Sequence, residues 1–172
     1  MKAVSLLREQ LQSAHETQEA TMADVTEEAA QFTDTNKAIP VGAAYAHSIL
    51  GEDMVLSTML MQKDPLAKDN STIGLSIPMP STSEWEKHEQ WYKTVKIDLP
   101  KLKEFAKVVY KTTDDYLASL TDEDLDKELD RPMVGKHNIA WFITNFIILH
   151  IANLTGEISS VKGLQGLKGY PF

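Results

Sequence analysis

The chain has 172 residues, a length that can bury one continuous core, and its 42% hydrophobic and 24% charged residues are ordinary for a globular protein. We expect one domain over residues 1–172. The net charge of −8 argues against nucleic acid and anionic membrane surfaces as partners, because like charges repel. Since the chain has no cysteine, disulfides, thiolate metal ligands and a cysteine nucleophile are excluded.

The N-terminal residues lack the apolar core and the small-residue cleavage site of a secretory leader. The longest apolar run, residues 141–154, is shorter than the roughly 20 residues that span a bilayer, and it contains Asn145, His150 and Asn153. We therefore expect a cytoplasmic protein in which residues 141–154 form a buried core helix.

Apolar residues recur at helical spacing from the N-terminus. We expect a break near Asp24 and a second short helix starting at Thr26, with Glu27 and Glu28 favourably placed in its first turn. Steps of mostly three and four predict an amphipathic first segment through Val4, Leu7, Leu11, Ala14, Met22, Val25, Ala29 and Phe32.

A long second helix is predicted over residues 41–61, after a connector over residues 34–40. The last connector residue, Pro40, suits the first turn of a helix. The first half of this helix is small and apolar nearly all round, which predicts close packing on several sides.

Residues 63–98 are rich in proline and polar side chains and form an unusually long connection. Within it, Ser83 and Glu86 have the spacing of a capping box and predict a short helix over residues 84–91. Such a connection can carry the chain from one end of a bundle to the other, form a lid or make a dimer contact.

Two further helices complete the pattern. Helical spacing predicts one over residues 99–120 and a very apolar one over residues 137–161, with a short acidic turn over residues 121–130 between them. We find no strand-like alternation of useful length. The sequence therefore predicts an all-α fold, an antiparallel four-helix bundle with a long connection between helices two and three.

One face of the last predicted helix changes from apolar to polar along its length. Its members step by four and three residues and are Ile139, Ile143, Phe146, His150, Asn153 and Glu157. We expect His150, Asn153 and Glu157 to point inward near one end of the bundle. The neighbouring stripe, which includes Leu154, is almost wholly apolar.

His47 lies in a similarly apolar part of the second helix. Inward imidazoles on neighbouring helices can supply two nitrogen ligands to a divalent metal, and Glu157 or water can complete such a site. A different interpretation stays open, because a single histidine on an apolar face is more often a hydrogen-bonded core residue than a ligand.

The remaining polar candidates are weaker. His15 is interpreted as a surface or groove residue, and His88 as part of a packed surface helix or, alternatively, of a flap over the site. Glu52 and Asp53 are expected at the rim, although either can orient a histidine. Phosphate-binding loops, metalloprotease helices and nucleophile elbows are absent from the sequence.

The segments AAYAHSILGED (43–53) and HIANLTGEISSVKGLQGLKGYPF (150–172) resemble the DinB-like superfamily. This resemblance implies a four-helix bundle, often dimeric, with a zinc or nickel site built from one histidine of the second helix and two of the fourth. Carried over, His47 matches the first ligand and His150 the second. The third ligand position falls on Leu154, which cannot bind a metal.

We therefore interpret the chain as a DinB-like protein with a degenerate metal site and a role in small-ligand binding or interaction. His47, His150 and Glu157 are the candidate metal residues, with zinc, nickel or no metal bound, and Asn153 is a candidate ligand-binding residue. The alternative is a metal-dependent enzyme similar to thiol-dependent S-transferases. The resemblance also implies a homodimer, while the sequence indicates neither a substrate nor catalytic residues.

Overall fold

The computed structural model describes residues 2–32, 38–132 and 134–172, and it is mostly helical with one small two-stranded sheet. The expected connector over residues 34–40 lies largely outside the described residues. The long helices are α1 (Ala3–Thr21), α3 (Val41–Met54) with the π-helical η1 (Val55–Leu60), α5 (Leu99–Ser119), and the continuous run α6 (Ile139–Phe142), η4 (Ile143–Ile148, π-helical) and α7 (Leu149–Leu164). The predicted positions of all four long helices are confirmed.

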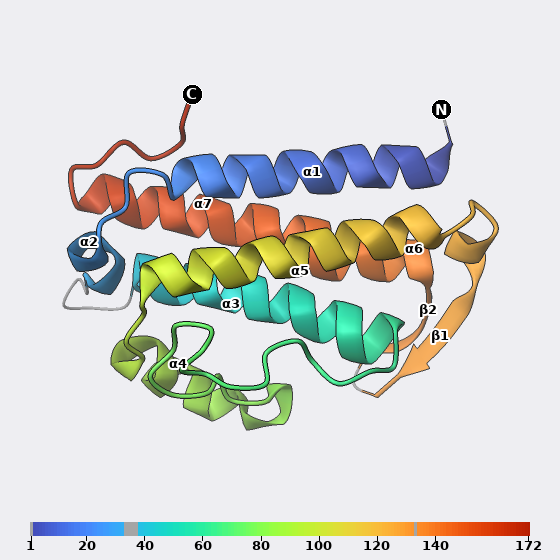
Figure 1. The fold of residues 1–172 in the computed structure, drawn as a ribbon, viewed down its shortest axis with the longest axis horizontal. Helices are drawn as coiled ribbons and strands as arrows, with labels where there is room; N and C mark the ends of the chain where they lie inside the picture. Colours follow the sequence, from blue (N-terminus) through green and yellow to red (C-terminus); the bar gives the residue numbers. More distant parts are fainter. Residues whose placement is uncertain (1, 33–37, 133) are drawn as a thin grey trace.

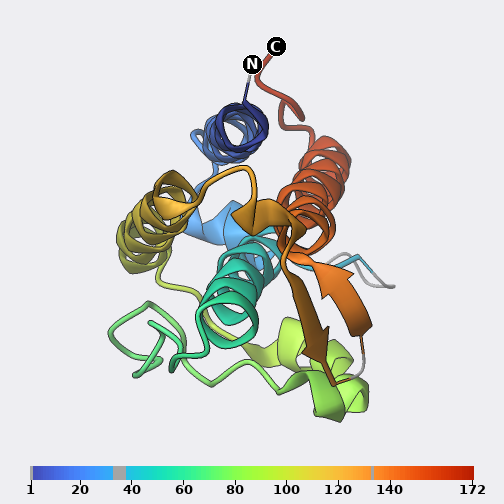
Figure 2. The same cartoon turned by 90° about the vertical axis from the view of Figure 1, so that its right-hand side faces the viewer.

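The long helices lie side by side, with α1 and α7 running in one direction and α3 and α5 in the other (Figure 1). Viewed end on, α3 is flanked by α5 and α7, and α1 lies opposite it (Figure 2). Because α3 and α5 run in the same direction, the connection between them returns the chain to the starting end, which was one of its expected roles.

Short helices sit near the predicted places. The second short helix is α2 (Glu27–Gln31), and the side chain of Thr26 accepts a hydrogen bond from the backbone N–H of Ala29 at its start. In the connection, η2 (Thr82–Glu84) leads into α4 (Trp85–Thr94). The predicted capping box is wrong, because the helix starts later and its N-cap residue, Glu84, makes no side-chain capping bond.

A hairpin was missed by the sequence reasoning. After the 3-10 turn η3 (Asp124–Asp126), β1 (Glu128–Arg131) pairs antiparallel with β2 (Gly135–Asn138), with Leu129 opposite His137. The strands are short and their side chains largely polar, so no apolar alternation marks them. The hairpin lies beside the start of the last helix run, at one end of the long helices (Figure 2).

By length and composition alone, Ile139–Leu164 qualifies as a membrane-spanning helix, with a mean hydropathy of 1.5 in its most apolar window, of which 39% is buried. In the structure its inner face packs against the other long helices, and Phe142, Ile147 and Ile151 are fully buried. This helix therefore forms part of the core of a globular domain, as we expected for residues 141–154.

Candidate functional site

His47 on α3 and His150 on α7 face each other across the interface of the two helices. Their ring centroids are 5.0 Å apart and the ring planes are inclined by 47°. Both residues are partly buried. The predicted convergence of the two imidazoles is therefore confirmed.

Gly51, one helical turn after His47, makes this approach possible. A methyl group at position 51 would lie 3.1 Å from Nε2 and 3.3 Å from Cδ2 of His150. These distances are tighter than ordinary van der Waals contact. The lack of a side chain at Gly51 therefore lets the His150 ring pack directly against α3.

Helix α4 of the long connection adds two rings to this pair. The hydroxyl of Tyr92 and Nδ1 of His47 form a hydrogen bond, and the two rings are stacked with centroids 5.7 Å apart. His88, which is buried, lies 6.1 Å from the His47 ring, and its Nε2 donates to the carbonyl oxygen of Ser81 at 3.3 Å. His88 therefore belongs to a packed helix, as one of its two interpretations had it, and this helix lies against the His47 ring.

Burial sets the protonation of the cluster. It lowers the pKa of His47 to about 4, an effect that the neighbouring His150 and His88 reinforce, and it also lowers the pKa of His150. Burial raises the pKa of Tyr92 to about 12, with a further contribution from the charge of Glu157. At neutral pH the cluster thus combines uncharged His47 and His150 with a protonated phenol.

The polar face predicted on the last helix is only partly turned inward. Asn153 and Glu157 are exposed, so the expectation that they point into the interior is wrong. Leu154 is buried with the apolar stripe, and His150 lies at the edge of that stripe. Glu157 is close enough to Tyr92 to affect its pKa, which places its carboxylate at the outer margin of the cluster.

The donor set for a zinc or nickel ion is incomplete. Within residues 2–32, 38–132 and 134–172, no group of three or more histidine, aspartate and glutamate side chains is arranged to hold a metal ion. His47 and His150 supply two nitrogens, while the third position of the family pattern holds buried Leu154. The residues present therefore do not fit the metal that the resemblance implies.

Glu52 and Asp53 lie inside the molecule, so their expected place at the rim is wrong. Each is only 1% exposed. Asp53 accepts hydrogen bonds from the backbone N–H groups of Leu66 and Ala67 and so holds the start of the long connection against α3. Glu52 contacts His15 instead of His47. The sequence feature that could have predicted this burial is the presence of two acidic residues within an otherwise apolar helix.

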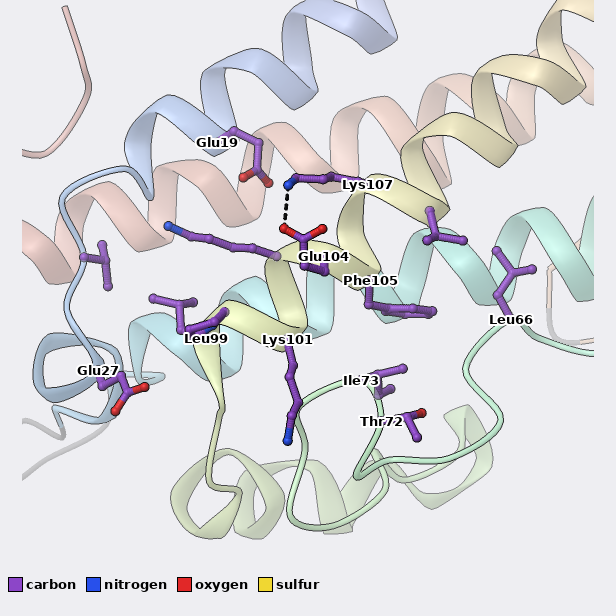
Figure 3. Close-up of a pocket in the computed structure, with 14 residues that line it drawn as sticks. Glu19, Glu27, Leu66, Thr72, Ile73, Leu99, Lys101, Glu104, Phe105 and Lys107 are labelled. Atoms are coloured by element: carbon purple, nitrogen blue, oxygen red, sulfur yellow. Dashed lines mark hydrogen bonds and ion pairs between the residues drawn. The ribbon is translucent and has the colours of Figure 1, made fainter.

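A cavity of about 980 Å³ lies away from the histidines, between the first half of α5 and the long connection (Figure 3). Leu99, Phe105 and Ile73 form part of its apolar lining. Its lysines already have partners in the protein, as Lys107 shows with Glu104 at 2.5 Å. Lys101 likewise pairs with Asp98, and Lys103 donates to the carbonyl oxygen of Met22.

No protein-family model and no curated protein matches the chain. Among solved structures, it is similar to a conserved protein from Enterococcus faecalis, with a TM-score of 0.76 and 21% sequence identity. The similarity covers 95% of this chain and 99% of the other. At this level of identity the comparison supports the fold alone.

Proposed function

We propose that the chain is a DinB-like four-helix bundle whose metal site is degenerate, and that the cluster around His47 and His150 binds a small polar ligand. The observation that carries this proposal is the pairing of two converging imidazoles with a buried leucine, Leu154, at the third position of the family pattern.

The chemistry of the cluster favours a neutral ligand. The low pKa values of His47 and His150 keep both rings uncharged near neutral pH, so each ring has one donor and one acceptor nitrogen. Glu157 at the margin repels anions. A small molecule with hydroxyl or amide groups matches these hydrogen-bonding atoms, and Asn153 lies one turn from His150 on the exposed side.

The first experiment tests for the metal. Protein purified without an affinity tag is expected to contain no stoichiometric zinc or nickel, and its melting temperature should not change with a chelator. Leu154→His is expected to create zinc affinity that raises the melting temperature. Combining it with His47→Ala should abolish that gain, and a Leu154→His variant that binds zinc no better than wild type would show that the site is misplaced.

The second experiment tests for the ligand. Titration with acetamide, a neutral molecule with one donor group and one acceptor, should shift the side-chain NMR signals of His47 and His150. The signal of His137, which stacks on Trp141 in the hairpin region at 3.6 Å, serves as the unaffected control. Equal shifts at all three histidines would contradict a site at this cluster.

The position of His88 favours a second candidate, a metal-dependent enzyme similar to thiol-dependent S-transferases. His88 brings a third imidazole to within 6.1 Å of His47, so a modest movement of α4 would complete a three-nitrogen donor set. In this case wild-type protein would carry one metal ion per chain, and His88→Ala would lose it.

We also propose that the protein is a cytoplasmic homodimer. Exposed apolar residues line a groove between α1 and α7 and support this proposal, among them Leu6 and Leu149. Sedimentation equilibrium is expected to give twice the chain mass for the wild type and the chain mass for Leu149→Glu. A monomeric wild type would refute the dimer.

A further inference from the structure

A second polar cluster, separate from the one around His47, connects three long helices through the carboxylate of Glu52. Nε2 of His15 on α1 lies 2.9 Å from Oε2 of Glu52 on α3, and the hydroxyl of Thr113 on α5 donates to Oε1 of the same carboxylate at 2.6 Å. A carboxylate only accepts hydrogen bonds, so Nε2 of His15 carries the hydrogen of this bond. The lone pair of the neutral ring then lies on Nδ1.

The His15 ring is held on a face as well as at one edge. Tyr110 stacks on it with ring centroids 3.8 Å apart and planes inclined by 21°. The Tyr110 hydroxyl donates to Glu19 at 2.8 Å, and Tyr45 donates to the same carboxylate oxygen at 2.6 Å. These contacts fix the orientation of the imidazole before any ligand arrives.

The ring lines a groove of about 540 Å³ between α1 and α5. Within residues 2–32, 38–132 and 134–172, Nε2 is the ring nitrogen of His15 that is hydrogen-bonded to the protein, and Nδ1 has no protein partner. The rim of the groove is polar and includes the ion pair of Arg8 with Asp114 at 2.8 Å. A fixed imidazole with an available nitrogen thus meets a space of a size that admits a small polar molecule.

We propose that this groove is a second site, in which His15 accepts a proton from a hydroxyl-bearing molecule and Glu52 positions the ring. The reaction class that such a pair supports is hydrolysis or acyl transfer of a small ester. Nδ1 takes the hydroxyl proton while that oxygen bonds to the acyl carbon. The proton then passes to the leaving oxygen as the ester C–O bond breaks, so no further reactant is needed.

The tautomer of His15 gives a test that needs no variant. Long-range ¹H–¹⁵N NMR of the full chain, at a pH where the ring is neutral, should show the hydrogen on Nε2. Glu52→Gln should move it to Nδ1, because the new amide can donate to Nε2, whereas Glu16→Gln in the same groove should change nothing. A wild-type ring protonated at Nδ1 would overturn the proposal.

Hydrolysis of p-nitrophenyl acetate by the full chain tests the activity. We expect His15→Gln and Glu52→Gln each to lower the rate by about tenfold or more, while His137→Gln leaves it unchanged. The acetamide titration tests the proposed ligand site separately, so each site can fail or succeed independently of the other.

Gln12→Trp provides a second variant, because it fills the groove from its exposed side without removing His15 or Glu52. It should slow hydrolysis even if the buried substitutions unfold the protein. Equal rates in wild type, Gln12→Trp and a folded His15→Gln would refute the second site.

Discussion

At the scale of single residues, Gly51 and Glu52 are neighbours on α3 and serve different polar clusters. Gly51 makes room for His150 of α7, and Glu52 accepts hydrogen bonds from His15 of α1 and Thr113 of α5. Successive residues of a helix point in different directions. The ligand cluster and the second proposed site therefore lie on different faces of the same turn of α3.

Gly51→Ala is expected to destabilise the fold by about 1–3 kcal/mol, because the new methyl group meets the His150 ring. In an unhindered helix the same exchange stabilises by roughly 0.5–1 kcal/mol. Urea unfolding monitored by circular dichroism gives the free energy of unfolding.

Gly163→Ala is the matched control, since a methyl group there would have no neighbour within 4 Å, and it should stabilise. In the background of His150→Ala, the penalty of Gly51→Ala should disappear. If Gly51→Ala stabilises the wild type as Gly163→Ala does, the described packing of His150 is wrong.

The free energy of unfolding should fall as the pH drops from 6.5 towards 4. The pKa of His47 is about 4 in the folded chain and 6.5 as the ordinary value, so in this window the unfolded chain binds a proton that the folded chain does not. The stabilisation is present above pH 6.5 and lost as the pH falls, by at most about 3 kcal/mol.

Urea unfolding at several pH values measures this loss, and His47→Gln should flatten the curve of unfolding free energy against pH. A curve as steep in His47→Gln as in the wild type would assign the loss to other groups.

Which polar residues would meet was only partly predictable. His47 and His150 were identified because each interrupts an apolar stripe of its own helix. The burial of His15 and Glu52 depends on partners that other helices supply, and no spacing rule within one helix encodes such a partner. His88 was ambiguous for the same reason, because the path of the long connection decides where α4 docks.

At the scale of elements, the last helix shows how a change of helical pitch displaces a predicted face. Ile143–Ile148 is π-helical, and a π-helical turn holds more residues than an α-helical turn. The buried residues Ile143, Ile147 and Ile151 are accordingly spaced by four. A stripe counted at the ordinary α-helical period through this segment therefore assigned Asn153 and Glu157 to the inner face incorrectly.

Hydrogen bonds of Lys162 link the C-terminal end of α7 to the C-terminal end of α1. Lys162 is 1% exposed, and its Nζ donates to the carbonyl oxygen of Thr21 and to Asp24. Lys162→Met is expected to cost about 1–3 kcal/mol, because the Thr21 carbonyl loses its buried donor. Thermal unfolding measures this loss.

Asp24→Asn should cost much less than Lys162→Met, because the Asp24 side chain is 52% exposed and its ion pair is screened by water. The Thr21 contact is retained in this variant. Equal losses in the two variants would contradict the assignment of the main stabilisation to the Thr21 carbonyl.

At the scale of the whole molecule, the buried apolar residues form two clusters that share the long helices. Leu102 and Ile158 belong to one cluster, and Leu117 and Ile151 to the other. Each pair comes from α5 and α7, so neither cluster can separate without breaking both helices. We expect one cooperative unfolding transition.

Leu102→Ala in the first cluster and Ile147→Ala in the second should each cost about 2–5 kcal/mol and shift the same transition. Calorimetry checks this through the agreement of the calorimetric and van't Hoff enthalpies. Two separated transitions in either variant would show that the clusters unfold independently.

The sequence by itself determined the positions of the long helices and of the short helix after Thr26, because these features follow from the periodicity of apolar residues along each helix. It also predicted that His47 and His150 would meet, because each histidine interrupts an apolar part of its own helix and the two helices were expected to be neighbours. Only the tertiary structure decided the placement of α4 over the histidines, the burial of Glu52 with His15 and the outward position of Glu157. Those depend on contacts between segments far apart in the chain, and the cost of burying a polar group is set by the partner it finds there.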